Sequence, residues 1–285
     1  LVAPGTWIAS LKSAAAPAEN ALWPISSFYQ YQGGTSQAGP QVSGAAAVFI
    51  QYFREVITNT TPSPALVKAA LINSAVDMPS ENGTDPVPNH DEGWGRVDLT
   101  PICDSRRRYD FLDQGVLLTT GQSFERRIYV ASHSMPLKIT LAYTDVPGLP
   151  AAIPALVNDL DLEVTGPDGI LYRGNQFLLG ESAPNPLDAD NINNVEAVHL
   201  QDPLPGEYRI RVHARSVSED ARQDTTALDQ DFALVTSGDL PLPGVGFVIM
   251  DRLAYTAPST IGLKLVDLNL PADTRVQLKL RSTTE

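Results

Sequence analysis

The sequence predicts a multi-domain protein in which an α/β portion is followed by an all-β region. In the first hundred residues, loops alternate with helix patterns whose apolar residues recur at spacings of three and four. From about Tyr109 the pattern changes to short alternating runs separated by Pro-Asp-Gly and Leu-Pro-Gly turns, which is typical of an antiparallel sandwich or jelly roll. We therefore expect three regions, at residues 1–108, 109–237 and 238–285.

The composition is that of a globular protein with an acidic surface. Twenty Lys and Arg against 33 Asp and Glu give a net charge of -13, which repels phosphate backbones and argues against a nucleic-acid partner. Cys103 is the single cysteine, so an internal disulfide is excluded. The apolar run near residues 45–50 is far shorter than the roughly 20 residues that span a bilayer. With no leader at its start, the chain is expected to be a segment of a longer protein without a membrane span.

Two helices are expected in the first region. The first follows Gly34 and has one apolar face. The second begins at Ser63, because a serine N-cap followed by proline in the first turn marks a helix start. Its Ala-rich surface predicts close packing on a neighbour. The positions that define the apolar face of the first helix are Val42, Ala45, Ala46, Phe49, Tyr52 and Phe53.

Six short strands are expected in the second region, because alternating apolar residues place one face of each strand in a core. A Pro-rich link at residues 238–244 then leads to residues 245–285, which are again strand-like. About 40 residues are marginal as an independent core, so this last region looks like the start of a further β unit. The six expected strands are residues 125–130, 137–143, 160–165, 195–200, 207–213 and 231–236.

Ser36 lies among small residues just ahead of the first helix. A serine hydroxyl becomes a useful nucleophile when a base takes its proton and donors stabilise the resulting oxyanion. Gly34 would let the backbone approach a substrate closely, and the N–H groups at a helix N-terminus attract developing negative charge. The alternative is a plain helix cap, because Ser and Thr are favoured there for hydrogen bonding alone.

Residues 34–44, G-T-S-Q-A-G-P-Q-V-S-G, closely resemble the serine motif of subtilisin-like proteases, G-T-S-x-A-x-P-x-V-x-G. Residues 2–6 look like the A-P-G segment that precedes this motif, and residues 93–98 are similar to the motif that closes the catalytic domain. The resemblance implies that residues 1–108 are the C-terminal part of a subtilisin-like α/β catalytic domain. Gln37 stands where many relatives carry an oxidisable Met, and we hypothesise that it tolerates oxidants better.

The same resemblance implies roles for three neighbouring residues. Ser36 would be the acyl-forming nucleophile of a serine endopeptidase, with Gly34 and Thr35 in the vicinity of the oxyanion and a protein or peptide as substrate. In this family the Asp, the His and the oxyanion Asn come from segments upstream of the A-P-G region. We therefore expect the chain to need the upstream half of the catalytic domain as a partner and to be inactive by itself.

None of the four histidines stands in the family's sequence context. His90 and Asp91 are adjacent, and adjacent side chains rarely point at each other, so a local dyad is not expected. His133, His199 and His213 are expected to be structural. The alternative to a protease is a catalytically silent scaffold or binding module that keeps the subtilase portion.

Residues 109–237 resemble the C-terminal jelly-roll barrel of a bacterial subtilase branch, related in architecture to the P-domain of proprotein convertases. Residues 246–270 are similar to immunoglobulin-like repeats of large bacterial surface and secreted proteins, and we expect a partial unit of that kind. These resemblances imply a protein that is secreted or on the cell surface.

Calcium is the one cofactor that the sequence suggests. Asp145, Asp159 and Asp161 could supply hard oxygen ligands, and relatives of this kind bind calcium in the barrel. Strand alternation would place Asp159 and Asp161 on one face and Asn158 on the other, so Asn158 is a doubtful ligand. The alternative is that these Asp and Asn residues only make turns.

Overall fold

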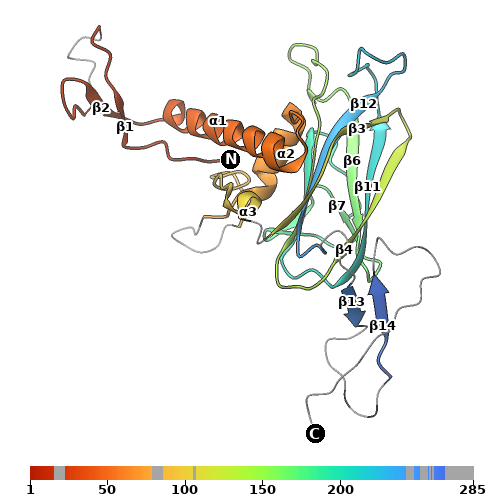
Figure 1. The fold of residues 1–285 in the computed structure, drawn as a ribbon. Coiled ribbons are helices and arrows are strands. Elements are labelled where there is room, and N and C mark those ends of the chain that lie inside the picture. The colour runs from red at the N-terminus through yellow and green to blue at the C-terminus, as the bar shows by residue number, and fades with distance from the viewer. Residues whose placement is uncertain are drawn as a thin grey trace. The chain divides into compact units, whose positions relative to one another are not determined.

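A computed structural model describes residues 1–15, 23–78, 86–104, 107–241, 247–250, 256, 258 and 260–266. The chain divides into two compact units, Leu1–Leu240 and Pro241–Glu285. The first two predicted regions together form the first unit, in which helices are followed along the chain by strands (Figure 1).

The helices of the described chain all lie within its first 103 residues. A short antiparallel strand pair, β1 with β2, comes before them. Among the described residues, no helix is long and apolar enough to cross a membrane. The elements are β1 (Ile8–Leu11), β2 (Tyr29–Gln32), α1 (Thr35–Tyr52), its π-helical extension η2 (Phe53–Ile57), α2 (Pro64–Ser74) and α3 (Thr100–Cys103).

Both expected helices are present, and α2 begins as predicted. The Ser63 side chain accepts the backbone N–H of Leu66 at 3.0 Å, and Pro64 occupies the first helical position. The face of α1 is covered only near its C-terminal end, where Phe49 is fully buried. Val48, one residue earlier, is 51% exposed. The rest of α1 is exposed or only partly covered within the described residues.

The second part of this unit is two antiparallel sheets of four strands each, with orders β10-β5-β12-β3 and β4-β11-β6-β7. All six expected strands are present within a few residues of their predicted bounds, and the predicted jelly-roll connectivity stays a prediction. The strands are β3 (Arg108–Leu118), β4 (Ser123–Val130), β5 (Leu137–Ala142), β6 (Asp159–Thr165), β7 (Leu171–Arg173), β10 (Val195–Leu200), β11 (Gly206–Ser216) and β12 (Gln230–Gly238). Two short strands, β8 (Phe177–Leu178) and β9 (Glu181–Ser182), pair with each other.

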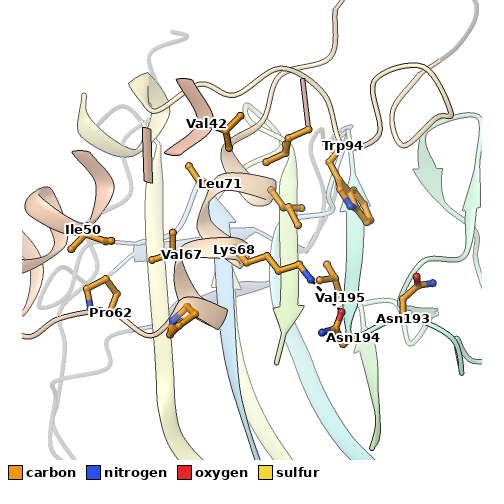
Figure 2. A pocket seen from close by; sticks show the side chains of 13 residues that line it. Val42, Ile50, Pro62, Val67, Lys68, Leu71, Trp94, Asn193, Asn194 and Val195 are labelled. Carbon is orange, nitrogen blue, oxygen red and sulfur yellow. Dashed lines mark hydrogen bonds between the residues drawn. The ribbon is translucent and has the colours of Figure 1, made fainter. Parts of the chain in front are cut away.

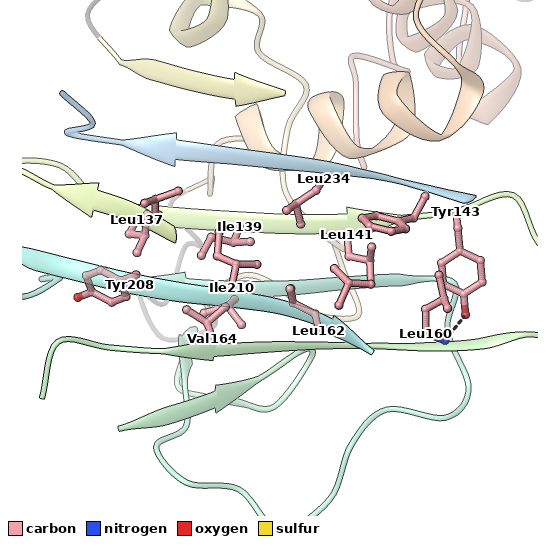
Figure 3. Close-up of a cluster of buried hydrophobic side chains, with 14 of the residues drawn as sticks. Leu137, Ile139, Leu141, Tyr143, Leu160, Leu162, Val164, Tyr208, Ile210 and Leu234 are labelled. Atoms are coloured by element: carbon pink, nitrogen blue, oxygen red, sulfur yellow. Dashed lines mark hydrogen bonds between the residues drawn. The ribbon is translucent and has the colours of Figure 1, made fainter. Parts of the chain in front are cut away.

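A continuous apolar core fills the space between the two sheets (Figure 3). Alternate residues of a strand share a face, so Leu137, Ile139 and Leu141 of β5 point into the same core as side chains of β6 and β11. All three are completely buried. This core is the principal source of stability for the second half of the unit, because apolar burial dominates folding.

A second core joins α2 to the outer face of the β10-β5-β12-β3 sheet. It contains Leu66, Ala69 and Ala70 of α2 together with Ala142 and Val235 of the sheet. The predicted close packing of the Ala-rich helix is thereby confirmed. Residues on either side of the predicted boundary at position 108 consequently share one interior.

Asn73, near the end of α2, adds polar contacts to the same interface. Its completely buried side chain donates to the carbonyl oxygens of Lys138 and Val235, each at 3.2 Å, and to Thr140 Oγ1 at 3.1 Å. One amide thus links the helix to two adjacent strands.

The second unit is described in part. Its two described strands, β13 (Phe247–Met250) and β14 (Leu263–Val266), pair antiparallel. The predicted immunoglobulin-like unit lies largely outside the described residues, so that expectation stays a prediction.

Candidate functional site

The three motifs of the first region lie together in space. Val2 and Arg96 form a parallel bridge, with the N–H of Val2 donating to Gly95 O at 3.0 Å. The N–H of Gly34 donates to Gly5 O at 2.6 Å. Residues 2–6 therefore contact both the start of α1 and the motif at residues 93–98, which are distant from each other along the chain.

The contact between Gly5 and Gly34 requires glycine at both positions. A Cβ at residue 5 would stand 2.9 Å from Gly34 O, closer than real Cβ contacts. Gly34 is the N-cap of α1 and has a φ of 143°, which L side chains rarely adopt. The Gln41 side chain adds a second link by donating to Pro4 O. The A-P-G segment is thus fixed against the first turns of α1.

Ser36 lies in the first turn of α1 with its side chain exposed. The N-cap is Gly34 and has no side-chain hydrogen bond, so the serine does not act as the cap of this helix. Within the described residues, no hydrogen bond involves Ser36 Oγ. The first N–H groups of a helix lack intrahelical acceptors, which leaves donors for an anion beside this hydroxyl.

No histidine of the described chain is hydrogen-bonded to Ser36. His90 lies in a turn closed by two backbone hydrogen bonds between Asn89 and Gly93, and no hydrogen bond joins it to Asp91 in the described residues. His133 is exposed after β4, and His199 is buried on β10. His213 Nδ1 lies 2.9 Å from Ser123 Oγ on the outer face of the sandwich.

An apolar cavity of about 730 Å³ lies beside the helices (Figure 2). Val42 and Ile50 of α1, Val67 of α2 and Trp94 contribute to its wall. Lys68 Nζ donates to Asn194 Oδ1 at 3.2 Å across one side, and burial lowers the pKa of this lysine. Ser36 does not line this cavity.

The candidate calcium ligands separate into two groups. Asp145 Oδ1 accepts the N–H groups of Val146 and Asn158, and its Oδ2 accepts that of Val157 at 2.8 Å. The buried Asn158 amide donates to Glu219 O and Gln230 Oε1, each at 2.9 Å. Both side chains are therefore engaged in holding loops.

Asp159 and Asp161 lie on one face of β6, as the alternation predicted. Asp159 Oδ1, Asp161 Oδ1 and Glu196 Oε1 are buried and have no hydrogen-bond partner. Burial, followed by the charge of Asp159, raises the pKa of Asp161 to about 6. Burial also raises the pKa of Glu196 well above its ordinary value, and the carboxylates of Asp161, Asp190 and Asp159 raise it further.

The ionised forms of these side chains repel one another, and Arg215, whose Nε lies 4.0 Å from Asp159 Oδ2, offsets part of this repulsion. Glu196 Oε2 accepts the N–H of Leu162 at 2.7 Å, so one of its oxygens is already oriented toward β6. In the described part of the chain, no group of three or more His, Cys, Asp or Glu side chains is arranged to hold a metal ion.

Residues 1–95 match the subtilase family. The first third of the chain is thus similar to a family of proteases, and this stretch includes the first two motifs and the beginning of the third. A search of curated proteins found no match.

Two solved structures show distant likeness. One is the Bacillus licheniformis lipase BlEst2 in its propeptide form, with 11% identity over 47% of this chain and 22% of that chain and a TM-score of 0.24. The other is a protein of Sulfurospirillum deleyianum, with 8% identity over 46% of this chain and 96% of that chain and a TM-score of 0.22. Likeness at these scores carries no argument about fold or function.

Proposed function

We propose that this chain is the C-terminal part of a secreted or cell-surface serine endopeptidase of subtilisin type, with Ser36 as its nucleophile. The observation that carries the proposal is the exposed Ser36 hydroxyl, which is neither a helix cap nor hydrogen-bonded and lies at the free N–H groups of α1. The match of residues 1–95 to the subtilase family supports it.

The mechanism follows from this position. Ser36 Oγ attacks the carbonyl carbon of a peptide bond while a base takes its proton, and the leaving amine departs from the acyl-enzyme. The backbone N–H of Ser36, beside Gly34 and Thr35, would donate to the developing oxyanion. The base, its orienting Asp and an oxyanion Asn are supplied from sequence upstream of Leu1, as in the family that residues 34–44 resemble.

The surface of α1 supports a covering partner. A Cβ built on Gly39 or Gly44 meets nothing within 4 Å, and Val48 is half exposed. Small residues permit the close approach of another element, and an apolar side chain such as Val48 gains from burial. We assign this surface to the upstream half of the catalytic domain.

Labelling with a fluorophosphonate probe tests the nucleophile. The chain is prepared alone and co-expressed with its upstream region, each as wild type, Ser36→Ala and Ser43→Ala. Ser43 is the matched control, because it is exposed on the same helix and its hydroxyl bonds Gly39 O at 3.2 Å. We expect labelling only with the upstream region present, lost in Ser36→Ala and kept in Ser43→Ala. Folded protein that never labels would instead favour the binding-module alternative.

We also propose that Asp159 and Asp161 help to hold a structural Ca²⁺. Two buried carboxylate oxygens without partners, Asp159 Oδ1 and Asp161 Oδ1, are of the hard type that this ion prefers, and backbone carbonyl oxygens and water would supply its remaining ligands. A bound cation would stabilise the ionised carboxylates that now repel one another. Asp145 is a weaker candidate, because three backbone N–H groups already occupy its oxygens.

A further inference from the structure

A second cavity, of about 500 Å³, lies where the end of α2 meets the β10-β5-β12-β3 sheet. Its wall includes Ser74 and Asp77 from the end of α2 and the segment after it. Three basic side chains, Arg107, Lys138 and His199, line the same space. This concentration of basic groups is unexpected in a chain whose net charge is -13.

Strand register brings two of these groups together. Lys138 of β5 and His199 of β10 are direct cross-strand partners, which places their Cβ atoms roughly 5 Å apart on one face. Leu137 and Ile139, the neighbours of Lys138, point into the sandwich core, so Lys138 and His199 point to the opposite face, where α2 packs. His199 is only 2% exposed, and its ring contacts the rings of Trp94 and Phe177.

The two cations of the cavity are held by backbone carbonyls, and the one carboxylate that favours the charged form of Lys138 is that of Asp77. Arg107 donates to Pro136 O, and Lys138 Nζ donates to Ala75 O at 2.9 Å. Neither forms an ion pair within the described residues. Asp77, the acidic residue of the cavity wall, shares a hydrogen bond with Glu92. Burial and the carboxylate of Glu92 raise the pKa of Asp77. Backbone carbonyls thus orient the two cations without neutralising them.

The electrostatics of the cavity reflect this imbalance. Burial and the charge of Arg107 lower the pKa of Lys138 to about 8. Burial, Lys138 and Arg107 lower the pKa of His199 to about 3. At neutral pH the cavity therefore presents two cations and a neutral imidazole.

Several polar atoms in the wall lack a hydrogen-bond partner, and two of them, Arg107 Nε and Ser74 Oγ, are donors. Arg107 Nε, Ser74 Oγ and His199 Nε2 are buried without a hydrogen-bond partner. Buried polar atoms are nearly always paired, and leaving a donor unpaired inside a protein is costly. An oxygen-rich anion would supply acceptors to these donors and offset the charge of the two cations.

We propose that this cavity binds a small oxyanion, a carboxylate or a phosphate, between Arg107, Lys138, His199 and Ser74. Lys138 retains N–H groups beyond the one given to Ala75, and Arg107 Nε adds a directional donor. Because α2 forms one side of the site and the sheet the other, a bound oxyanion stabilises the junction between them. This inference does not depend on the proposed protease function.

Thermal unfolding of the 285-residue chain tests the site. Sodium phosphate, sulfate and acetate are compared with sodium chloride at equal ionic strength. We expect a saturable rise of the midpoint, roughly 5 °C at an oxyanion concentration of about 100 times Kd. The anion whose effect saturates at the lowest concentration, among phosphate, sulfate and acetate, is the one that the site prefers.

Two variants separate site binding from general salt effects. Lys138→Met removes the ammonium and should abolish the rise. Lys68→Met is the matched control, because Lys68 is an exposed lysine of α2 that lines the other cavity, and it should keep the rise. Equal rises in wild type and Lys138→Met, or an equal rise with chloride, would overturn the proposal.

If Lys138→Met does not fold, a measurement on the wild-type chain tests the proposal instead. The pKa of the Lys138 ammonium is followed by NMR of lysine-labelled protein with and without phosphate. A bound anion favours the charged form, so the pKa should rise from about 8. A Lys138 pKa that is unchanged at saturating phosphate contradicts the proposal.

Discussion

Gly5 and Gly34 are joined backbone to backbone: the N–H of Gly34 donates to Gly5 O at 2.6 Å, and no side chain separates them. We predict that Gly5→Ala disturbs this contact, because the new Cβ would lie 2.9 Å from Gly34 O and 3.2 Å from Ala38 Cβ. The expected cost is about 1–3 kcal/mol of local stability, measured as faster hydrogen exchange of the Gly34 amide.

Gly39→Ala is the control for that substitution. A Cβ at residue 39 meets nothing within 4 Å, and alanine is a better helix former than glycine by roughly 1 kcal/mol. Its effect should be neutral or stabilising. If both variants changed exchange at Gly34 equally, the close contact would not be the cause.

Asn73→Ala should weaken the junction between α2 and the sheet. The substitution removes three hydrogen bonds and leaves Thr140 Oγ1 and two carbonyl groups without this donor in a dry interior. We expect a loss of about 3 kcal/mol in the free energy of unfolding, measured with urea. Gln51→Ala, which truncates an exposed amide on α1, should stay within about 0.5 kcal/mol of wild type.

Stability in oxyanion-free buffer should increase between about pH 8 and pH 9.5. The pKa of Lys138 is about 8 in the folded chain, against 10.5 for an ordinary lysine, so in this interval the unfolded chain binds more protons. Raising the pH removes a charge that the folded state disfavours. Three titratable groups surround this lysine: Arg107, His199 and Asp77. Of these, only Asp77 favours the charged form of Lys138.

Comparison with Lys138→Met isolates this contribution from those of the other titrating side chains. Urea unfolding across the interval should give a rising difference between wild type and variant. Parallel curves for the two proteins would mean that Lys138 titrates normally.

Calcium should raise the midpoint of thermal unfolding relative to EDTA at neutral pH. The ion would offset the repulsion between Asp159 and Asp161. Asp161→Asn should abolish the difference and be more stable than wild type in EDTA, because it removes a buried charge. Asp202→Asn, at an exposed position, should respond to calcium as wild type does. A calcium response that survives in Asp161→Asn would exclude this site.

Gln37→Met should make the proposed protease sensitive to peroxide. Residue 37 follows Ser36 directly, and oxidation would turn an apolar thioether into a polar sulfoxide there. Activity of the chain with its upstream region is measured before and after peroxide. The three native methionines make treated wild type the appropriate control, and equal losses would contradict the prediction.

The sequence predicts the strands well where alternation is uninterrupted, as in β5 and β10. It misses β3, because this strand is irregular: Gln114 has a φ of 49°, and the register with β12 shifts between Asp231 and Ala233. Such a bulge breaks the period of two on which strand prediction depends. β7, β8 and β9 have two or three residues each, too few to establish a period.

The two candidate sites differ in how far sequence can reveal them. Ser36 stands in a contiguous motif, so local pattern is sufficient to single it out. Arg107, Lys138 and His199 are separated by 31 and 61 positions, the differences between their residue numbers, and only strand register brings them together. A weak signal existed, because a lysine and a histidine interrupt strands whose other residues are largely apolar.

The shared interior of α2 and the sheet constrains how this protein can be recombined. Leu66 and Ala70 lie in the same cluster as Val235, which is 165 positions beyond Ala70. A chimera that exchanged the sandwich at residue 108 for that of a relative would place an unfamiliar sheet surface under α2. A chimera whose junction is chosen from the sequence motifs alone would therefore divide a single hydrophobic interior. A chimera that folds has to take α2, β5 and β12 from the same parent protein.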